Sequence, residues 1–241
     1  MPLPAYLLLW ITVVLSGGTV FFFSGIRKRV LKLLLAFSGA YLFALCVIHL
    51  IPEVYSSPVK NIGIYVLAGF FLQVALEIFS EGIEHGHIHI HIHKHQQQAF
   101  PFALMVGLCV HSFLEGMPLV QQFSDEKTRN SLLAGIILHH IPVAIALTSM
   151  LLESGIKKGG ALFYLILFAC MAPFGAITSN LLSETAVTNI SNFFDQVMAL
   201  VIGIFLHIST TILFESSEEH RFNYYKLATI ILGAGLALIS L

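Results

Sequence analysis

Long apolar runs alternate with short polar connections along the whole chain. A helix of ~20 residues crosses the ~30 Å hydrocarbon layer of a bilayer, so apolar runs of that length are candidate transmembrane helices. Eight such runs lie at residues 4–24, 31–52, 61–80, 100–122, 131–152, 160–182, 194–215 and 223–241. Because the connections are short, the pattern predicts an all-α integral membrane protein of eight transmembrane helices, with residues 1–241 forming a single domain.

The composition agrees with the bilayer as the main partner of this chain. Of its 241 residues 57% are hydrophobic and only 10% are charged, whereas charged residues make up about 25% of a typical soluble domain. The net charge of -1 and the lack of a dense Lys/Arg face predict no nucleic-acid partner. The first apolar run has no basic segment before it and is too long for a cleaved signal peptide, which favours a first spanning helix.

Basic residues are divided unequally between the two sets of connections. Nine fall in the odd-numbered connections and three, Lys60, Lys127 and Arg129, in the even-numbered ones. Loops on the cytoplasmic side carry the excess of Lys and Arg. This predicts both termini outside the cytoplasm and residues 84–98 inside it. A plasma (inner) membrane is favoured, and an organellar membrane stays open.

The predicted cytoplasmic connection at 84–98 is rich in histidine. Alternate positions carry six of the twelve histidines of the chain: His85, His87, His89, His91, His93 and His95. Imidazoles on a flexible segment can gather around a divalent ion such as zinc without a fixed fold. We therefore expect this loop to bind metal. A biased, solvated loop and an inserted tag are the alternatives.

Ionisable side chains lie inside two consecutive apolar runs. His111, Ser112 and Glu115 lie in the fourth run, and His139 and His140 in the fifth. Such groups are costly in a membrane and indicate function. His111 and Glu115 share a helix face because they are four residues apart, while the adjacent His139 and His140 diverge by about 100°. Imidazole and carboxylate ligands suit zinc and other first-row divalent metals; the alternative is hydrogen bonding within the helix bundle.

Two prolines lie close to these residues. Pro118 and Pro142 each remove a helical N–H and free the carbonyl four residues earlier, at Leu114 and Leu138. Kinked helices at the depth of the ligands would favour a hydrated path. The alternative for each proline is a kink that serves packing alone.

Further polar groups near the ends of other predicted spans outline a secondary metal pathway. Glu77 and Glu81 lie near the inner end of the third span. The candidate pathway residues are His49, Glu53, His207 and Glu215. Interface positions and hydrogen bonds between helices are the alternative for each of them.

These motifs together resemble the ZIP (Zrt-, Irt-like protein) family of divalent metal transporters. They are the sequence 49–53 (HLIPE), His-Ser-x-x-Glu-Gly from His111, His-His-Ile-Pro from His139, and the His-rich connection after the third span. The resemblance implies metal movement into the cytoplasm through a site between the fourth and fifth spans. It also implies a 3+2+3 arrangement with inverted repeats and an alternating-access cycle, in which the bundle that carries the site moves against a scaffold.

Two positions depart from the pattern of the family. Ser112 replaces an Asn that many members have, and Val143 replaces a Glu one turn beyond His139. With fewer anionic ligands we expect one main site, although the number of metals stays open. Its expected ligands are His111, Glu115 and His139, with contributions from His140 and Ser112. Zinc fits this set better than magnesium or calcium; Fe2+, Mn2+, cobalt and Cd2+ stay open.

The sequence thus favours a transporter that is not an enzyme and carries no prosthetic group, with the metal ion as cargo. An intramembrane metalloenzyme is the first alternative, since an open metal position can activate water. The spacing of His111 and Glu115 is not the His-Glu-x-x-His of zinc proteases, however. A metal sensor without transport is the other alternative, and a homodimer is left open.

Overall fold

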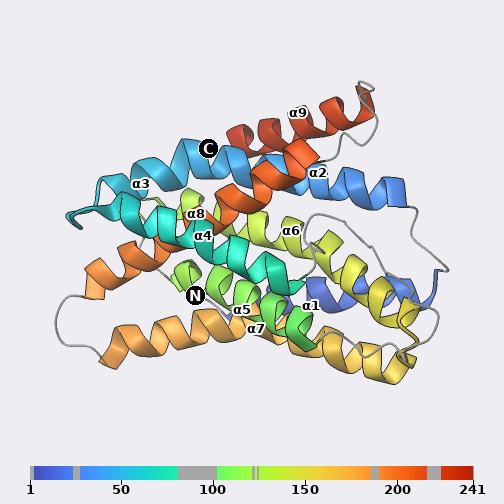
Figure 1. The fold of residues 1–241 in the computed structure, drawn as a ribbon. Coiled ribbons are helices and arrows are strands. Elements are labelled where there is room, and N and C mark those ends of the chain that lie inside the picture. The colour runs from blue at the N-terminus through green and yellow to red at the C-terminus, as the bar shows by residue number, and fades with distance from the viewer. Residues whose placement is uncertain are drawn as a thin grey trace.

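A computed structural model describes residues 3–23, 28–80, 102–120, 123, 125–185, 190–215 and 224–240 of the chain. Within these residues the regular secondary structure is helical, with no strand. The helices lie alongside one another in an elongated bundle (Figure 1). The predicted metal-binding loop at 84–98 lies outside the described residues.

The first part of the chain, up to Ser80, forms three apolar helical stretches. Their elements are α1 (Leu3–Gly18), a 3-10 turn (Thr19–Phe21), α2 (Lys28–Leu45), a π-helical turn (Cys46–Leu50), α3 (Ile51–Tyr55) and α4 (Ile62–Ser80). The π-helical turn ends at Leu50, two residues before Pro52, and includes His49. Since Pro52 has no N–H to donate, the wider turn lets the helix continue through it. Residues 28–55 therefore form one long helical stretch.

The second part contains five further helices. They are α5 (Phe102–Gly116), continued by a 3-10 turn (Met117–Val120), α6 (Glu126–Glu153), α7 (Lys158–Thr185), α8 (Ile190–Glu215) and α9 (Tyr224–Ile239). Pro118 lies in the 3-10 turn that ends α5, whereas Pro142 lies inside α6, which continues past it. The two prolines therefore act differently: Pro118 lies where a helix ends, whereas the helix around Pro142 continues without interruption.

Five of the helical stretches are long and apolar enough to cross a membrane: Leu3–Phe21, Lys28–Tyr55, Glu126–Glu153, Lys158–Leu182 and Asn192–Phe214. Shorter apolar helices, Ile62–Ile78, Leu104–Val120 and Tyr224–Ile239, occupy the other three predicted spans. The all-helical, multi-pass character of the protein is confirmed. The count of eight spans and their 3+2+3 arrangement stay predictions.

The helix of the fifth predicted span begins before its apolar run. The fifth predicted span starts at residue 131, but α6 begins at Glu126. Asp125 caps it, since its side chain accepts a hydrogen bond from the backbone N–H of Lys127 at 3.1 Å. A capped helix can extend beyond its apolar part because capping satisfies an otherwise free N–H. Hydropathy thus locates the apolar part of a helix but not the residue at which the helix begins.

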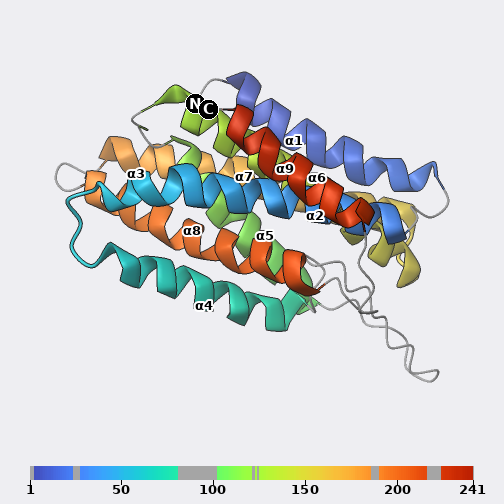
Figure 2. The same cartoon turned by 90° about the horizontal axis from the view of Figure 1, so that it is seen from above.

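Closely packed helix pairs organise the bundle. The most extensive contacts join α4 to α8 and α2 to α9, followed by α5 to α7 and α1 to α6; Figure 2 shows α4 beside α8 and α9 beside α2. Glycines allow this proximity. A methyl group on Gly69 or Gly203 would overlap the backbone of the facing helix in the α4–α8 pair, as would one on Gly116 or Gly175 in the α5–α7 pair. Small residues at such contacts are typical of membrane helices.

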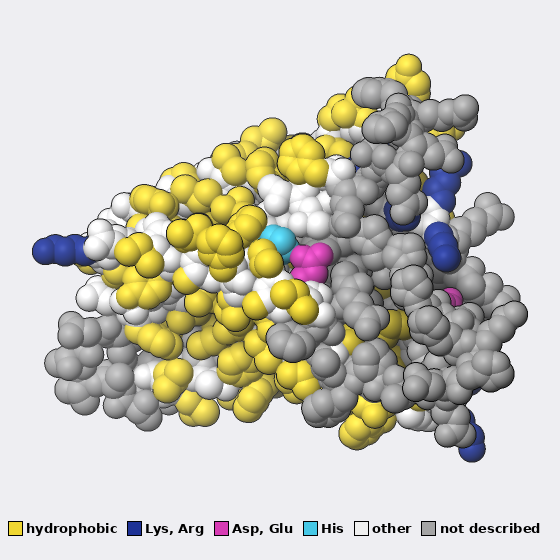
Figure 3. Space-filling view, viewed as in Figure 1, with side chains coloured by type: hydrophobic (Ala, Val, Ile, Leu, Met, Phe, Trp, Pro, Cys, Tyr) yellow, Lys and Arg dark blue, Asp and Glu magenta, His cyan; other side chains and the backbone are white. Residues whose placement is uncertain are grey.

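The surface of the bundle is suited to lipid. Large apolar side chains such as Leu67 on α4, Phe163 on α7 and Leu232 on α9 are more than half exposed. On the face shown in Figure 3 hydrophobic side chains predominate in the left and central part, around a His and an acidic side chain at the centre, while Lys and Arg lie at the two ends. This distribution matches a hydrocarbon layer bounded by polar headgroups.

Candidate metal site

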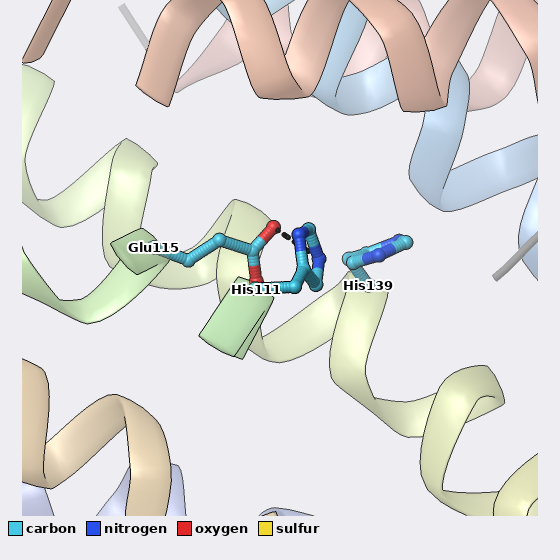
Figure 4. Close-up of side chains that lie close together, drawn as sticks. All are labelled: His111, Glu115 and His139. Carbon is cyan, nitrogen blue, oxygen red and sulfur yellow. Dashed lines mark ion pairs between the residues drawn. The ribbon is translucent and has the colours of Figure 1, made fainter. Parts of the chain in front are cut away.

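α5 and α6 bring three potential metal ligands together in the interior. One atom each of His111, Glu115 and His139 can be chosen so that all three lie within 4.8 Å of one another. All three side chains are at most 1% exposed. Figure 4 shows His111 and Glu115 extending from α5, with the His139 ring from α6 beside them. A divalent ion could contact all three groups.

Both carboxylate oxygens of Glu115 face an imidazole. Its Oε1 lies 3.1 Å from Nε2 of His111, and its Oε2 lies 2.8 Å from Nε2 of His140. The ring of His140 also packs against Phe168, with ring centroids 5.5 Å apart. The carboxylate thus lies between histidines of two helices. Because a buried carboxylate needs such partners, Glu115 links α5 to α6.

His139 and His140 point in different directions, as adjacent residues of a helix must. The centroid of the His139 ring lies 6.0 Å from that of His111 and 6.2 Å from that of His140. His139 therefore faces the His111 side of the carboxylate, while His140 contacts its other oxygen. In this arrangement His140 lies next to the three-residue cluster and contacts the carboxylate of Glu115.

Two neighbouring positions complete the surroundings. Ser112 is 1% exposed, and its hydroxyl oxygen has no hydrogen-bond partner among the described residues. Val143 is also 1% exposed, so the position one turn beyond His139 is apolar. With His140 beside it, the three-residue cluster is surrounded by the imidazoles of three histidines but has one carboxylate, a set that suits zinc better than a hard cation.

Gln73 on α4 is a neighbour of the site that the sequence analysis did not identify. It is fully buried, and its Oε1 lies 3.1 Å from Nδ1 of His111. A signal was present: Gln73 and Glu77 are polar residues four apart within an apolar helix, so they share one face. That face contacts histidines of two different helices.

The second of these contacts is a separate pair. Oε2 of Glu77 lies 2.6 Å from Nε2 of His207 on α8, and both side chains are partly exposed. Phe70 packs edge-on against the His207 ring, with centroids 4.9 Å apart. His207 thus belongs to an α4–α8 pair and not to the buried cluster.

The other predicted pathway residues lie elsewhere. His49 is in the π-helical turn and Glu53 in α3, and both are partly buried. Glu215 is the last residue of α8, and its side chain lies outside the described residues, as do the six loop histidines. Among the described residues, the cluster of three potential ligands is therefore confined to α5 and α6.

The fold and this cluster define a multi-pass helical membrane protein with a buried His/Glu site. The sequence model of the family described as ZIP Zinc transporter matches residues 80–241, and the chain belongs to that family. The resemblance predicted from the motifs is thereby confirmed.

Curated relatives agree with this membership. Zinc transporter ZIP9 of Micropogonias undulatus is 26% identical over 154 residues, which cover 62% of this chain and 49% of the relative. Zinc transporter ZIP9-B of Xenopus laevis is 26% identical over 160 residues, which cover 62% and 50%. The chain spans about half the length of these relatives.

Proposed function

We propose that this protein transports a divalent transition-metal cation, zinc first among them, into the cytoplasm through the site formed by α5 and α6. The observation that carries the proposal is the buried cluster of His111, Glu115 and His139, whose ligand atoms lie within 4.8 Å of one another. Membership of the ZIP zinc transporter family supports it, as do the relatives named zinc transporters.

The ligands of the buried site suit a metal ion that has to be released again after it binds. Glu115 supplies one negative charge, and the imidazoles of His111, His139 and His140 bind metal in their neutral form. A dication in this site would keep a net positive charge, so it is not neutralised as it would be by two carboxylates. The site would replace the hydration shell of zinc with protein ligands without the full Coulombic attraction of a more acidic centre.

The distribution of basic residues indicates which end of the proposed path faces the cytoplasm. Three contacts place several helix ends together: Lys158 Nζ donates to Phe21 O, Lys226 Nζ donates to Leu213 O, and Arg29 lies over the ring of Tyr225. Lys28, Arg29, Lys32, Lys157, Lys158 and Lys226 therefore belong to this end. Its positive charge favours the cytoplasm, where residues 84–98 would also lie.

The Glu77–His207 pair is the proposed binding position on the cytoplasmic side of the central site. The pair lies on α4 and α8, and α8 continues toward the basic end through Leu213. Glu215 and the six loop histidines would receive the ion beyond it. His49 and Glu53 near the outer end of the second span would guide the ion to the centre. Each step passes the ion between imidazole and carboxylate ligands.

The pattern of helix contacts supports an alternating-access mechanism. The glycine contacts with facing backbone lie within α4–α8, α5–α7 and α2–α9. Between α2 and α6, by contrast, Gly135 faces the side chains of Tyr41 and Leu42. Side chains can rearrange more easily than backbone, so α1, α5, α6 and α7 would move as one group against α2, α4, α8 and α9. Inverted repeats would also produce helix contacts in matching sets. In such a symmetry the α4–α8 contact would correspond to the α2–α9 contact, and the α5–α7 contact to the α1–α6 contact.

Uptake of radioactive zinc into proteoliposomes of the full chain tests this proposal. We expect uptake by the unmodified protein, none by His111→Ala, and inhibition by whichever of iron, manganese or cadmium also fits. Arg129→Ala at the start of α6 is a control, since this side chain pairs with Glu126 at the surface. Zinc that binds stoichiometrically without entering vesicles, over a range of pH and membrane potential, would instead favour a sensor or an enzyme.

A further inference from the structure

Gln73 is a fully buried polar residue on α4 that contacts the proposed site from a helix outside it. Its Oε1 lies 3.1 Å from Nδ1 of His111. We propose that Gln73 is a positioning residue, whose carbonyl oxygen holds His111 in the tautomer that presents Nε2 to the metal. This inference rests on the proposed metal site and adds a residue to it that binds no metal itself.

The chemistry of the two side chains gives the direction of the effect. A neutral imidazole carries a proton on one nitrogen and a lone pair on the other. An amide carbonyl can only accept, so Gln73 favours the proton on Nδ1. Nε2 then has the lone pair, and this nitrogen lies 3.1 Å from Oε1 of Glu115. A lone pair that faces a carboxylate oxygen is repelled by it, and a metal cation bound to both atoms removes this repulsion. The hydrogen bond thus makes His111 and Glu115 a site for a cation.

Partners of this kind matter for metal affinity in general. A metal-binding histidine usually donates its second N–H to a carboxylate, carbonyl or water, which fixes the ring and raises its basicity. Removing such a partner typically costs about 10- to 100-fold in metal affinity. A buried amide oxygen at 3.1 Å from Nδ1 meets this description for His111.

The position of Gln73 also connects the site to the second helix group. α4 packs on α8 through Gly69 and Gly203, whereas α5 packs on α7 through Gly116 and Gly175. The bond from Gln73 to His111 therefore crosses between groups that would move against each other. His111 would be held in its binding tautomer only while α4 and α5 keep this arrangement. Movement of the groups would release the ring and weaken binding.

Two substitutions of similar size separate this role from packing. Gln73→Met removes the acceptor, while Gln73→Glu keeps one. Ser38→Ala is the control, because Ser38 is equally buried but its hydroxyl donates to Leu35 O of its own helix. All variants are made in the full chain with the six loop histidines changed to serine, so that the loop does not contribute to the measured zinc binding. Affinity is measured by competition with a chromophoric zinc chelator.

We expect Gln73→Met to bind zinc about 10- to 100-fold more weakly, Ser38→Ala to keep the unmodified affinity, and Gln73→Glu to bind zinc clearly more tightly than Gln73→Met. In proteoliposomes Gln73→Met should raise KM for zinc more than it lowers the maximal rate. Equal losses in Gln73→Met and Gln73→Glu would reduce the role of Gln73 to packing and overturn the proposal. Unchanged affinity in Gln73→Met would do the same.

Nitrogen NMR of histidine-labelled protein tests the tautomer directly. The His111 signals are assigned by their loss in His111→Gln. Without metal, the unmodified protein should carry the ring proton on Nδ1, and Gln73→Met should shift the ring toward a mixture of tautomers. A proton on Nε2 in the unmodified protein would overturn the proposal. If zinc binds but is not transported, the proposed function fails, while binding and NMR still decide the role of Gln73.

Discussion

Two regions of the described structure each place a glutamate close to a histidine, in different surroundings. Glu115 and His140 lie 2.8 Å apart with side chains at most 2% exposed. Glu77 and His207 lie 2.6 Å apart, but their side chains are 27% and 11% exposed. The first pair has further imidazoles from His111 and His139 around it, whereas the second has an aromatic ring, Phe70, beside His207.

The difference shows how similar groups can serve different steps of one path. Few water molecules compete for a metal in a buried site, and charges there interact more strongly because the local dielectric is low. A partly exposed pair holds an ion less firmly, since water remains available to it. We therefore expect the buried cluster to determine affinity and selectivity, and the Glu77–His207 pair to affect the rate of release.

The largest expected effect comes from removing the charge of the buried cluster. Glu115→Gln keeps the size of the side chain but replaces an anionic ligand by a neutral amide. We expect zinc affinity and uptake to fall at least about 100-fold, equivalent to ~2.7 kcal/mol. Chelator competition and vesicle uptake measure this. Glu126→Gln is the control, since Glu126 is 82% exposed. A small loss in Glu115→Gln would mean that the cluster does not hold the metal.

Glycine substitutions should separate the two regions by their packing. A methyl group on Gly116, next to Glu115, would overlap the carbonyl oxygen of Ala172, and one on Gly203, a turn before His207, would overlap that of Val66. Overpacking of this kind costs about 1–3 kcal/mol, so Gly116→Ala and Gly203→Ala should both lower the thermal unfolding midpoint.

Gly116→Ala should weaken zinc binding at the centre more than Gly203→Ala, because it displaces α5, which carries His111 and Glu115, from α7. Gly159→Ala serves as the control, since a methyl group there meets nothing within 4 Å. If Gly203→Ala weakened zinc binding as much as Gly116→Ala, the two regions would not be independent.

A smaller effect is expected at the Glu77–His207 pair. His207→Ala should lower the maximal uptake rate roughly tenfold, which corresponds to ~1.4 kcal/mol, while zinc affinity at the buried cluster stays nearly unchanged. Affinity and initial rates measured on the same preparation test this. A loss of affinity as large as that of Glu115→Gln would show that both pairs belong to one site.

The smallest effect should come from making the buried cluster more acidic. Val143→Glu restores a carboxylate one turn beyond His139, and carboxylates favour harder ions such as manganese. We expect manganese to compete with zinc about threefold better, a change of roughly 0.7 kcal/mol. Val143→Gln controls for the cost of burying a polar group at a position that is 1% exposed. If manganese competed equally well in Val143→Glu and Val143→Gln, the added charge would not be the cause of the improved competition.

The sequence predicts best what depends on one helix alone. Apolar runs locate the helices because lipid requires apolar surface along a spanning segment. The shared face of His111 and Glu115 follows from their spacing, and Nε2 of His111 lies 3.1 Å from Oε1 of Glu115. The start of α6 at Glu126 was missed because the polar first turn depends on the Asp125 cap, which hydropathy does not register.

Contacts between helices were beyond the sequence pattern. Gln73 was not singled out, and the pairing of Glu77 with His207 was not predicted, because each depends on which helix lies beside α4. In lipid the outer and inner faces of a helix are both apolar, so hydropathy gives little information about neighbours. Spacing also shows that His139 and His140 diverge, but not which of them lies nearer His111.

The contacts of α8 and α9 bear on where a truncated version of the chain could begin. The family match starts at residue 80, but α8 packs on α4 and α9 packs on α2, both of which precede it. A fragment that begins at residue 80 would lack these surfaces, and its Gly203 and Gly233 would face lipid or another copy. We expect such a fragment to aggregate. Expressed together with residues 1–90, a fragment of residues 91–241 should instead reassemble with its missing helices.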